Sequence, residues 1–168
     1  MIPKGHAIVI DAPVTLAIAP AGDIIALDLW AGTLPDPGIR RLRVEPRRWW
    51  LFDAAGRSTD ITAQIGDNGA LAPIGGGLLR ATFTGSSWRA LLMVSGTFDA
   101  ENPRFGTGQV AATVIHHVPV WIAPIAADAC EVYFAASYAT DLVALWTRSI
   151  ALATGAGNTV TATTGRTA

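Results

Sequence analysis

Residues able to perform metal or acid–base chemistry are few in this chain, and their spacing is unfavourable. His116 and His117 are adjacent, so on a strand they point to opposite faces and cannot bind one metal ion together. His6 lies far away in the sequence, and Cys130 is the only cysteine. We therefore expect no metal site, with one histidine of the pair facing the core and the other facing solvent.

Hydroxyl and carboxylate groups offer no better candidate for catalysis. Ser86 and Ser87 follow Gly85, but the G-x-S-x-G elbow of a hydrolase nucleophile is missing, and capping of a helix explains them better. Asp99 and Glu101 lie in a polar stretch, where such groups commonly serve solubility rather than glycosidase chemistry. The sequence therefore predicts no catalytic residues.

Two patterns are typical of anion binding. The glycines at 75–77 resemble a phosphate cradle, but no lysine follows and a strand comes next, which favours a flexible hairpin turn. The segment 40–48 carries five arginines interleaved with Leu42 and Val44. It is either a cationic strip for a phosphate, a polyanionic ligand tail or an acidic partner, or a solvated strand face. A net charge of −1 and the lack of a nucleic-acid-binding signature argue against DNA or RNA.

The composition suggests that another chain covers part of the surface. Charged residues make up 15%, and six tryptophans are present, against about 25% charged residues in an average soluble protein. Low charge with many tryptophans is typical of interface cores, although a merely Ala- and Gly-rich domain is the alternative. The candidate partner-interface residues are Trp30, Trp50, Trp121, Arg41 and Arg43.

The chain also predicts a cellular setting. A single cysteine allows no intrachain disulfide, which fits a reducing compartment. No secretory signal is apparent, and the most apolar stretch, residues 12–29, is interrupted by Pro13, Pro20 and Asp23. We expect a cytoplasmic protein that binds no membrane.

The most legible element is a strand, glycine and helix unit within residues 81–108. Trp88, Leu91, Leu92 and Ser95 are spaced i, i+3, i+4 and i+7, which is one face of a helix. Gly96 then stands where a left-handed residue would end that helix.

The remaining periodicity predicts a mixture of strands and helices. A second main helix at 138–152 would bury Leu142, Val143, Trp146 and Ile150. A short helix is expected at 59–65, and strands at 6–10, 14–19, 23–30, 49–52, 70–74, 78–84, 109–116, 118–125 and 130–135. The predicted organisation is an N-terminal β extension at 1–38, an α+β domain at 39–153 and a mobile tail at 154–168.

A series of short segments between Arg47 and Leu152 stands in a recognisable order. They are Trp49-Trp50-Leu51, Gly85-Ser86-Ser87-Trp88-Arg89-Ala90-Leu91-Leu92, Gly96 with Phe98-Asp99, Arg104-Phe105-Gly106-Thr107-Gly108-Gln109, Ala112-Thr113, Ser137-Tyr138-Ala139 and Trp146. This order resembles the gamma subunit of heterotetrameric sarcosine oxidase and, more broadly, part of the aminomethyltransferase-like folate-binding proteins. The chain departs from the pattern at Pro73-Ile74-Gly75, where such proteins commonly have Asp-Leu-Ser, and at Ala136, where an arginine is usual.

The resemblance implies an α+β fold like that of the aminomethyltransferase folate-binding domain, with antiparallel sheets and two main helices packed on one face. It also implies a place in a heteromeric, flavin-dependent oxidoreductase. FAD, FMN, NAD and tetrahydrofolate would belong to larger catalytic partner subunits, and this chain would bind none of them but scaffold those subunits. The missing acidic residue near Gly75 argues against folate-dependent transfer by the chain itself. Two alternatives stay open, namely a free-standing folate-like ligand-binding protein or one-carbon transferase relative, and an unrelated assembly protein.

Overall fold

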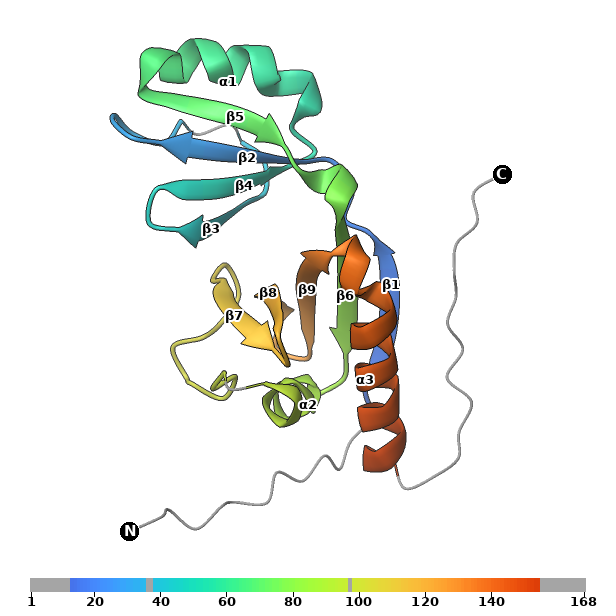
Figure 1. The fold of residues 1–168 in the computed structure, drawn as a ribbon. Helices are drawn as coiled ribbons and strands as arrows, with labels where there is room; N and C mark the ends of the chain where they lie inside the picture. The colour runs from blue at the N-terminus through green and yellow to red at the C-terminus, as the bar shows by residue number, and fades with distance from the viewer. Residues whose placement is uncertain (1–12, 36–37, 97, 155–168) are drawn as a thin grey trace.

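The computed structural model describes residues 13–35, 38–96 and 98–154. Their strands form two antiparallel sheets (Figure 1). The five-stranded sheet has the order β1 (Thr15–Pro20), β6 (Leu78–Thr84), β9 (Ala129–Ala135), β8 (Val118–Ala126) and β7 (Ala111–Ile115). The four-stranded sheet has the order β3 (Arg41–Glu45), β4 (Arg48–Phe52), β2 (Ile24–Leu29) and β5 (Gly69–Pro73). The helices are α1 (Ser58–Ile65), α2 (Trp88–Ser95) and α3 (Ala139–Ala153).

The four-stranded sheet is buried on both faces because its central strands are apolar on both. Along β4, Trp49 and Leu51 pack toward α1, whereas Trp50 and Phe52 pack toward the five-stranded sheet. Strand β2 alternates in the same way, with Ile25, Leu27 and Leu29 on the α1 side. This is the alternation expected from the sequence for that strand.

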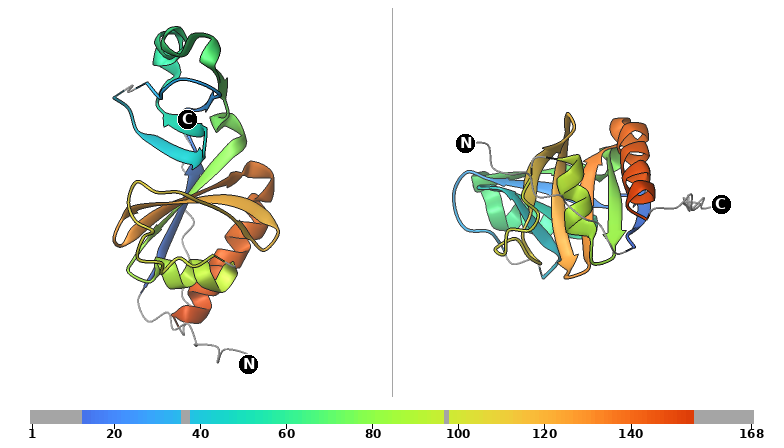
Figure 2. Two further views of the ribbon diagram at one scale, coloured as in Figure 1. Left: turned by 90° about the vertical axis from the view of Figure 1, so that its left-hand side faces the viewer. Right: turned by 90° about the horizontal axis from the view of Figure 1, so that it is seen from below.

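The five-stranded sheet uses its two faces differently. Along β9, Cys130, Val132 and Phe134 pack against α2 and α3, whereas Tyr133 faces the four-stranded sheet. The layers are therefore α1, the four-stranded sheet, the five-stranded sheet, and α2 with α3; Figure 2 shows α1 at one end of the molecule and the other two helices at the opposite end. The predicted α+β class with two main helices on one face is confirmed.

The core of the helical layer is aromatic. Trp88 of α2 and Trp146 of α3 are fully buried, and Trp146 makes edge-to-face contacts with Phe83 and Phe134. Such geometry adds about 0.5–1.5 kcal/mol per pair beyond burial alone. Two of the six tryptophans thus serve the interior of this layer.

The strands within the predicted N-terminal extension complete both sheets of this chain. β1 pairs with β6, and β2 lies between β4 and β5. A boundary at residue 38 therefore separates strands that are paired within one sheet. The expected strand at 6–10 and the tail beyond Thr154 lie outside the described residues.

The glycines at 75–77 do not form the hairpin turn expected from the sequence. They form a 3₁₀ turn between β5 and β6, which lie in different sheets and do not pair. A Cβ added to Gly75 would lie 2.0 Å from the carbonyl oxygen of Gly22 and 2.8 Å from the amide nitrogen of Ile24. The two segments that cross between the sheets, at 21–23 and 74–77, therefore pack backbone against backbone, which only glycine permits.

The helices do not begin and end with the capping interactions expected from the sequence. Ser87 occupies the N-cap position of α2 and Arg57 that of α1, and neither helix start receives a side-chain capping hydrogen bond. Gly96 has an extended conformation and forms a β-bridge with Ile115 instead of a left-handed cap. Both helices are held by burial of their apolar faces, which makes local capping dispensable.

The helices of the described residues are also too short or too polar to cross a bilayer; none carries an apolar run of the necessary length.

Replacing Gly75 with alanine should destabilise the protein by about 1–3 kcal/mol, because the new methyl group meets backbone atoms that cannot move independently. Gly76→Ala is the matched control, since a Cβ there meets nothing within 4 Å. Urea unfolding of both variants measures the difference. Equal stability of the two variants would contradict the close approach of the crossings.

Candidate functional site

The arginine-rich segment does not form one cationic strip. Arg41 and Arg43 lie on the exposed side of β3, where Arg43 donates to the Pro46 carbonyl oxygen at 2.6 Å. Arg40 and Arg48 instead pair with carboxylates of other strands. The solvated-face interpretation therefore describes Arg41 and Arg43 on β3, whereas Arg40 and Arg48 have acidic partners within this chain.

Glu131 is the centre of a buried polar cluster between the two sheets. Its carboxylate accepts a hydrogen bond from Arg40, a second from the Tyr133 hydroxyl at 2.7 Å, and lies 3.4 Å from Nη1 of Arg80. Arg40 also lies over the ring of Phe52, 4.4 Å from its centroid. The glutamate is 6% exposed, so these donors are what make its burial tolerable.

The environment shifts the proton equilibria of this cluster in predictable directions. Burial, followed by the hydrogen bond to Glu131, raises the pKa of Tyr133 above its ordinary value. For Arg40, burial lowers the pKa, but the hydrogen bond to Glu131 and the nearby negative charge outweigh it and the net shift is upward. The cluster thus keeps Arg40 charged and Tyr133 protonated. Its groups are engaged with one another in a structural contact, and none is left as an acid or base for catalysis.

A raised tyrosine pKa makes the protein sensitive to alkali. In the unfolded chain a tyrosine ionises near pH 10, whereas native Tyr133 stays protonated, so stability present below about pH 10 is lost as the pH rises further. Tyr133→Phe should be less stable by about 1–3 kcal/mol at neutral pH, from the lost charge-assisted hydrogen bond, and should lose less on moving to alkaline pH. Denaturant unfolding at both pH values tests this. An identical alkaline loss in variant and parent would show that Tyr133 is not the group responsible.

A cavity of about 420 Å³ lies between the sheets. It is lined by residues of both sheets and of the β5–β6 crossing: Ala26, Asp28, Val44, Glu45, Arg48, Trp50, Ala72, Ile74, Gly77, Leu78 and Trp121. Volumes of this size, with a mostly apolar lining and a few convergent polar groups, are typical of small-molecule sites. This inter-sheet cavity is therefore a candidate small-molecule site.

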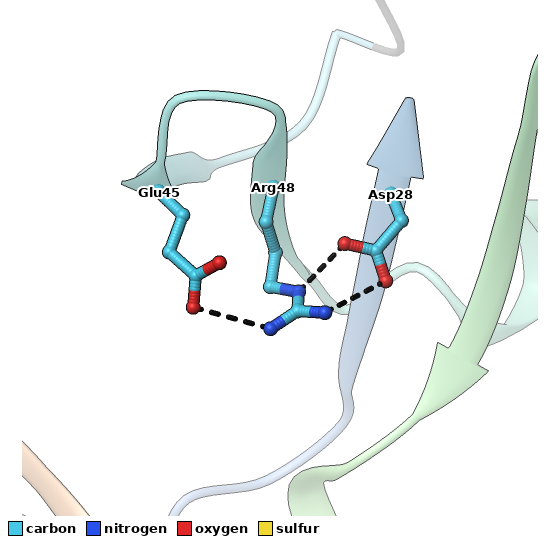
Figure 3. Close-up of polar contacts among 3 residues, drawn as sticks. All are labelled: Asp28, Glu45 and Arg48. Atoms are coloured by element: carbon cyan, nitrogen blue, oxygen red, sulfur yellow. Dashed lines mark hydrogen bonds and ion pairs between the residues drawn. The ribbon is translucent and has the colours of Figure 1, made fainter. Parts of the chain in front are cut away.

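Three charged side chains form the rim of the inter-sheet cavity (Figure 3). Arg48 donates to both oxygens of Asp28, at 2.6 and 3.2 Å, and through Nη1 to Glu45 at 3.1 Å. The hydrogen bond to Asp28, more than any other interaction, raises the pKa of Arg48. Sequence reasoning missed these three residues as a group, although a lone Asp28 within an apolar strand was the available signal.

The histidine pair lies at the tip of the β7–β8 hairpin, so the expectation of one core and one solvent-facing histidine is wrong. His116 has a left-handed backbone, with φ of 55°, and both side chains are exposed. A tight hairpin loop demands that conformation and removes both residues from the strand alternation. They line a second hollow together with Asp141 and Arg148 of α3.

The other chemical candidates serve local structure. Asp99 accepts a hydrogen bond from the amide of Glu101 at 3.1 Å, as in an Asx turn. Cys130 is fully buried, and its burial raises the pKa of the thiol. In the ranges 13–35, 38–96 and 98–154, no group of three or more His, Cys, Asp or Glu side chains is arranged to hold a metal ion.

The three tryptophans predicted as partner anchors lie in different settings. Trp30 is 55% exposed, and its ring nitrogen donates to the Asp67 carbonyl oxygen at 2.7 Å. Trp50 is buried between the sheets, where it packs on Trp121 with ring centroids 4.8 Å apart. Trp50 therefore belongs to the interior of this chain, whereas Trp30 and, in part, Trp121 remain accessible.

Comparison with known proteins gives a likeness in structure but not in sequence. No protein-family model matches the chain, and no curated protein matches it. Among solved structures, a chain of heterotetrameric sarcosine oxidase from Corynebacterium sp. U-96, in complex with pyrrole 2-carboxylate, superposes with a TM-score of 0.75 and 13% identity, covering 87% of this chain and 88% of that one. The two chains share one fold over nearly their whole lengths.

A weaker similarity links the chain to the regulatory subunit of aspartate kinase from Thermus thermophilus. The TM-score is 0.48 at 13% identity, covering 81% of this chain and 98% of that chain.

Proposed function

We propose that this chain is a non-catalytic, gamma-like small subunit of a heteromeric, flavin-dependent oxidoreductase of the sarcosine oxidase type. It scaffolds larger catalytic subunits, which carry FAD, FMN, NAD and tetrahydrofolate and act on an N-methyl amino acid. The observation that carries the proposal is the shared fold with a chain of heterotetrameric sarcosine oxidase across almost the full length of both.

Two features of the chain support a subunit role. Its charged fraction of 15% is low, and large apolar side chains are exposed at Trp30, Val94, Val114, Ile125 and Leu152. Depleted charge and exposed aromatic or aliphatic groups are typical of surfaces that another chain covers.

The chemistry of the described residues points the same way. Glu131, Asp28 and Glu45, the acids of the inter-sheet region, are each engaged by an arginine. Cys130 is buried with a raised thiol pKa. A folate-like binder using the arginine-rich segment is less well supported, because Arg40 and Arg48 are already paired with acids of this chain.

The test is to recover the tagged full chain from its native host and record the visible spectrum of the eluate. Co-elution of larger subunits with a flavin spectrum is the expected result, and turnover of N-methyl amino acids by that complex would follow. A colourless monomer would overturn the proposal.

Within that complex, Trp30→Ala should weaken assembly by about 30-fold, since a truncated aromatic anchor costs about 2 kcal/mol. Trp30→Phe keeps an aromatic ring but has a smaller contact area and loses the hydrogen bond to Asp67, so it should weaken assembly less than Trp30→Ala. Arg41→Ala and Arg43→Ala test the exposed face of β3 in the same assay. Assembly constants unaffected by all of these substitutions would contradict the predicted interface residues.

A further inference from the structure

The inter-sheet cavity combines an apolar lining with three charged side chains. It extends from the β5–β6 crossing, lined by Ile74, Gly77 and Leu78, to the ends of β2, β3 and β4 remote from the crossings. Asp28, Glu45 and Arg48 stand at those remote ends. At the opposite ends of the same strands, Ile24 and Phe52 pack in the core with Tyr133. Side chains therefore fill the space between the sheets only in part, and a cavity of about 420 Å³ remains.

The walls of the cavity are apolar and in part aromatic. Trp50 and Trp121 pack at 52° to each other, and Trp121 is only partly buried. Val44, Ile74 and Leu78 complete the apolar lining. Indole faces attract cations, and the attraction is stronger where water is excluded.

The rim carries an excess of negative charge. Two carboxylates, Asp28 and Glu45, surround one guanidinium, and Arg48 is the only cation among the described lining residues. Asp28 engages Arg48 through both of its oxygens, whereas Glu45 uses one oxygen and its side chain is 53% exposed. An incoming anion would meet two acids and an arginine already in use, whereas a cation would find Glu45 only partly neutralised.

This arrangement is held in place before any ligand arrives. Asp28 and Arg48 are directly opposite each other in the β2–β4 ladder. A β-bulge between Arg43 and Glu45 shifts the β3–β4 register so that Glu45 stands opposite Arg48. Bulges redirect side chains in this way, and a preformed rim lowers the entropy lost on binding.

We propose that the inter-sheet cavity binds a small organic cation, a protonated amine or guanidine on an aromatic or aliphatic body. The apolar body lies against Trp50 and Trp121, and the cationic group lies at Glu45. This site is independent of subunit assembly, so it stands or falls apart from the proposed function.

Three probes with the same apolar body and different charges test the proposal on the full chain, either alone or with co-purified subunits. These are phenylpropylamine, phenylpropanol and phenylpropionate, titrated at neutral pH with tryptophan fluorescence and ligand-observed NMR as readouts. The amine should bind at one site and about tenfold or more tighter than the alcohol, which corresponds to about 1.4 kcal/mol; the propionate should bind most weakly.

Substitutions of individual residues show where on the protein the probes bind. Glu45→Gln should weaken the amine about three- to tenfold and leave the alcohol unchanged, because only the charged ligand senses that carboxylate. Trp121→Ala should weaken both the amine and the alcohol. Asp60→Asn, which removes the same charge from the exposed surface of α1 on the other side of the four-stranded sheet, is the matched control and should change neither.

The proposal is overturned if none of the probes binds, or if the three bind with equal affinity. It is also overturned if Glu45→Gln and Asp60→Asn behave alike toward the amine, since the cation would then lie elsewhere.

Discussion

The two chain crossings between the sheets pack so closely that a Cβ at Gly75 would fall 2.0 Å from the carbonyl oxygen of Gly22. This approach fixes how the four-stranded sheet lies over the five-stranded sheet, because both of its connections pass through the same point. The buried Glu131 of β9 then links the two sheets through Arg40, which directly precedes β3, while its second donor, Tyr133, belongs to its own strand. The strand ends remote from the crossings carry the polar rim of the inter-sheet cavity.

The buried polar cluster and the rim of the cavity are both built from arginine–carboxylate pairs, but they differ in burial and in effect. Glu131 is almost fully enclosed and receives donors from several directions, which gives a specific contact between layers rather than a large gain in stability. Asp28, Glu45 and Arg48 are each about half exposed, so their contribution to stability is small. Their value lies in a preformed charge pattern beside an apolar cavity.

The fold shared with a chain of heterotetrameric sarcosine oxidase persists at 13% identity. Such persistence is physically reasonable because burial patterns and strand pairing constrain residue class more than residue identity. The same tolerance explains why function has to be argued from the surface and the cavity. The fully buried Trp88 and Trp146 serve the core. Accessible groups carry the two proposals: Trp30 that of subunit assembly, and Glu45 that of cation binding.

The sequence alone determined the positions of most strands and all three helices, and which residues of β2 and α2 face inward, because hydrophobic periodicity is a local property. The pairing of strands distant in sequence decided the remaining features of the fold. Only the tertiary structure placed β5 and β6 in different sheets, which turned an expected glycine hairpin into a crossing. It also moved His116 and His117 into a hairpin tip and brought Asp28, Glu45 and Arg48 to one rim. These outcomes depend on contacts between residues distant in sequence, and the spacing of residues along one strand carries no information about its partner in space.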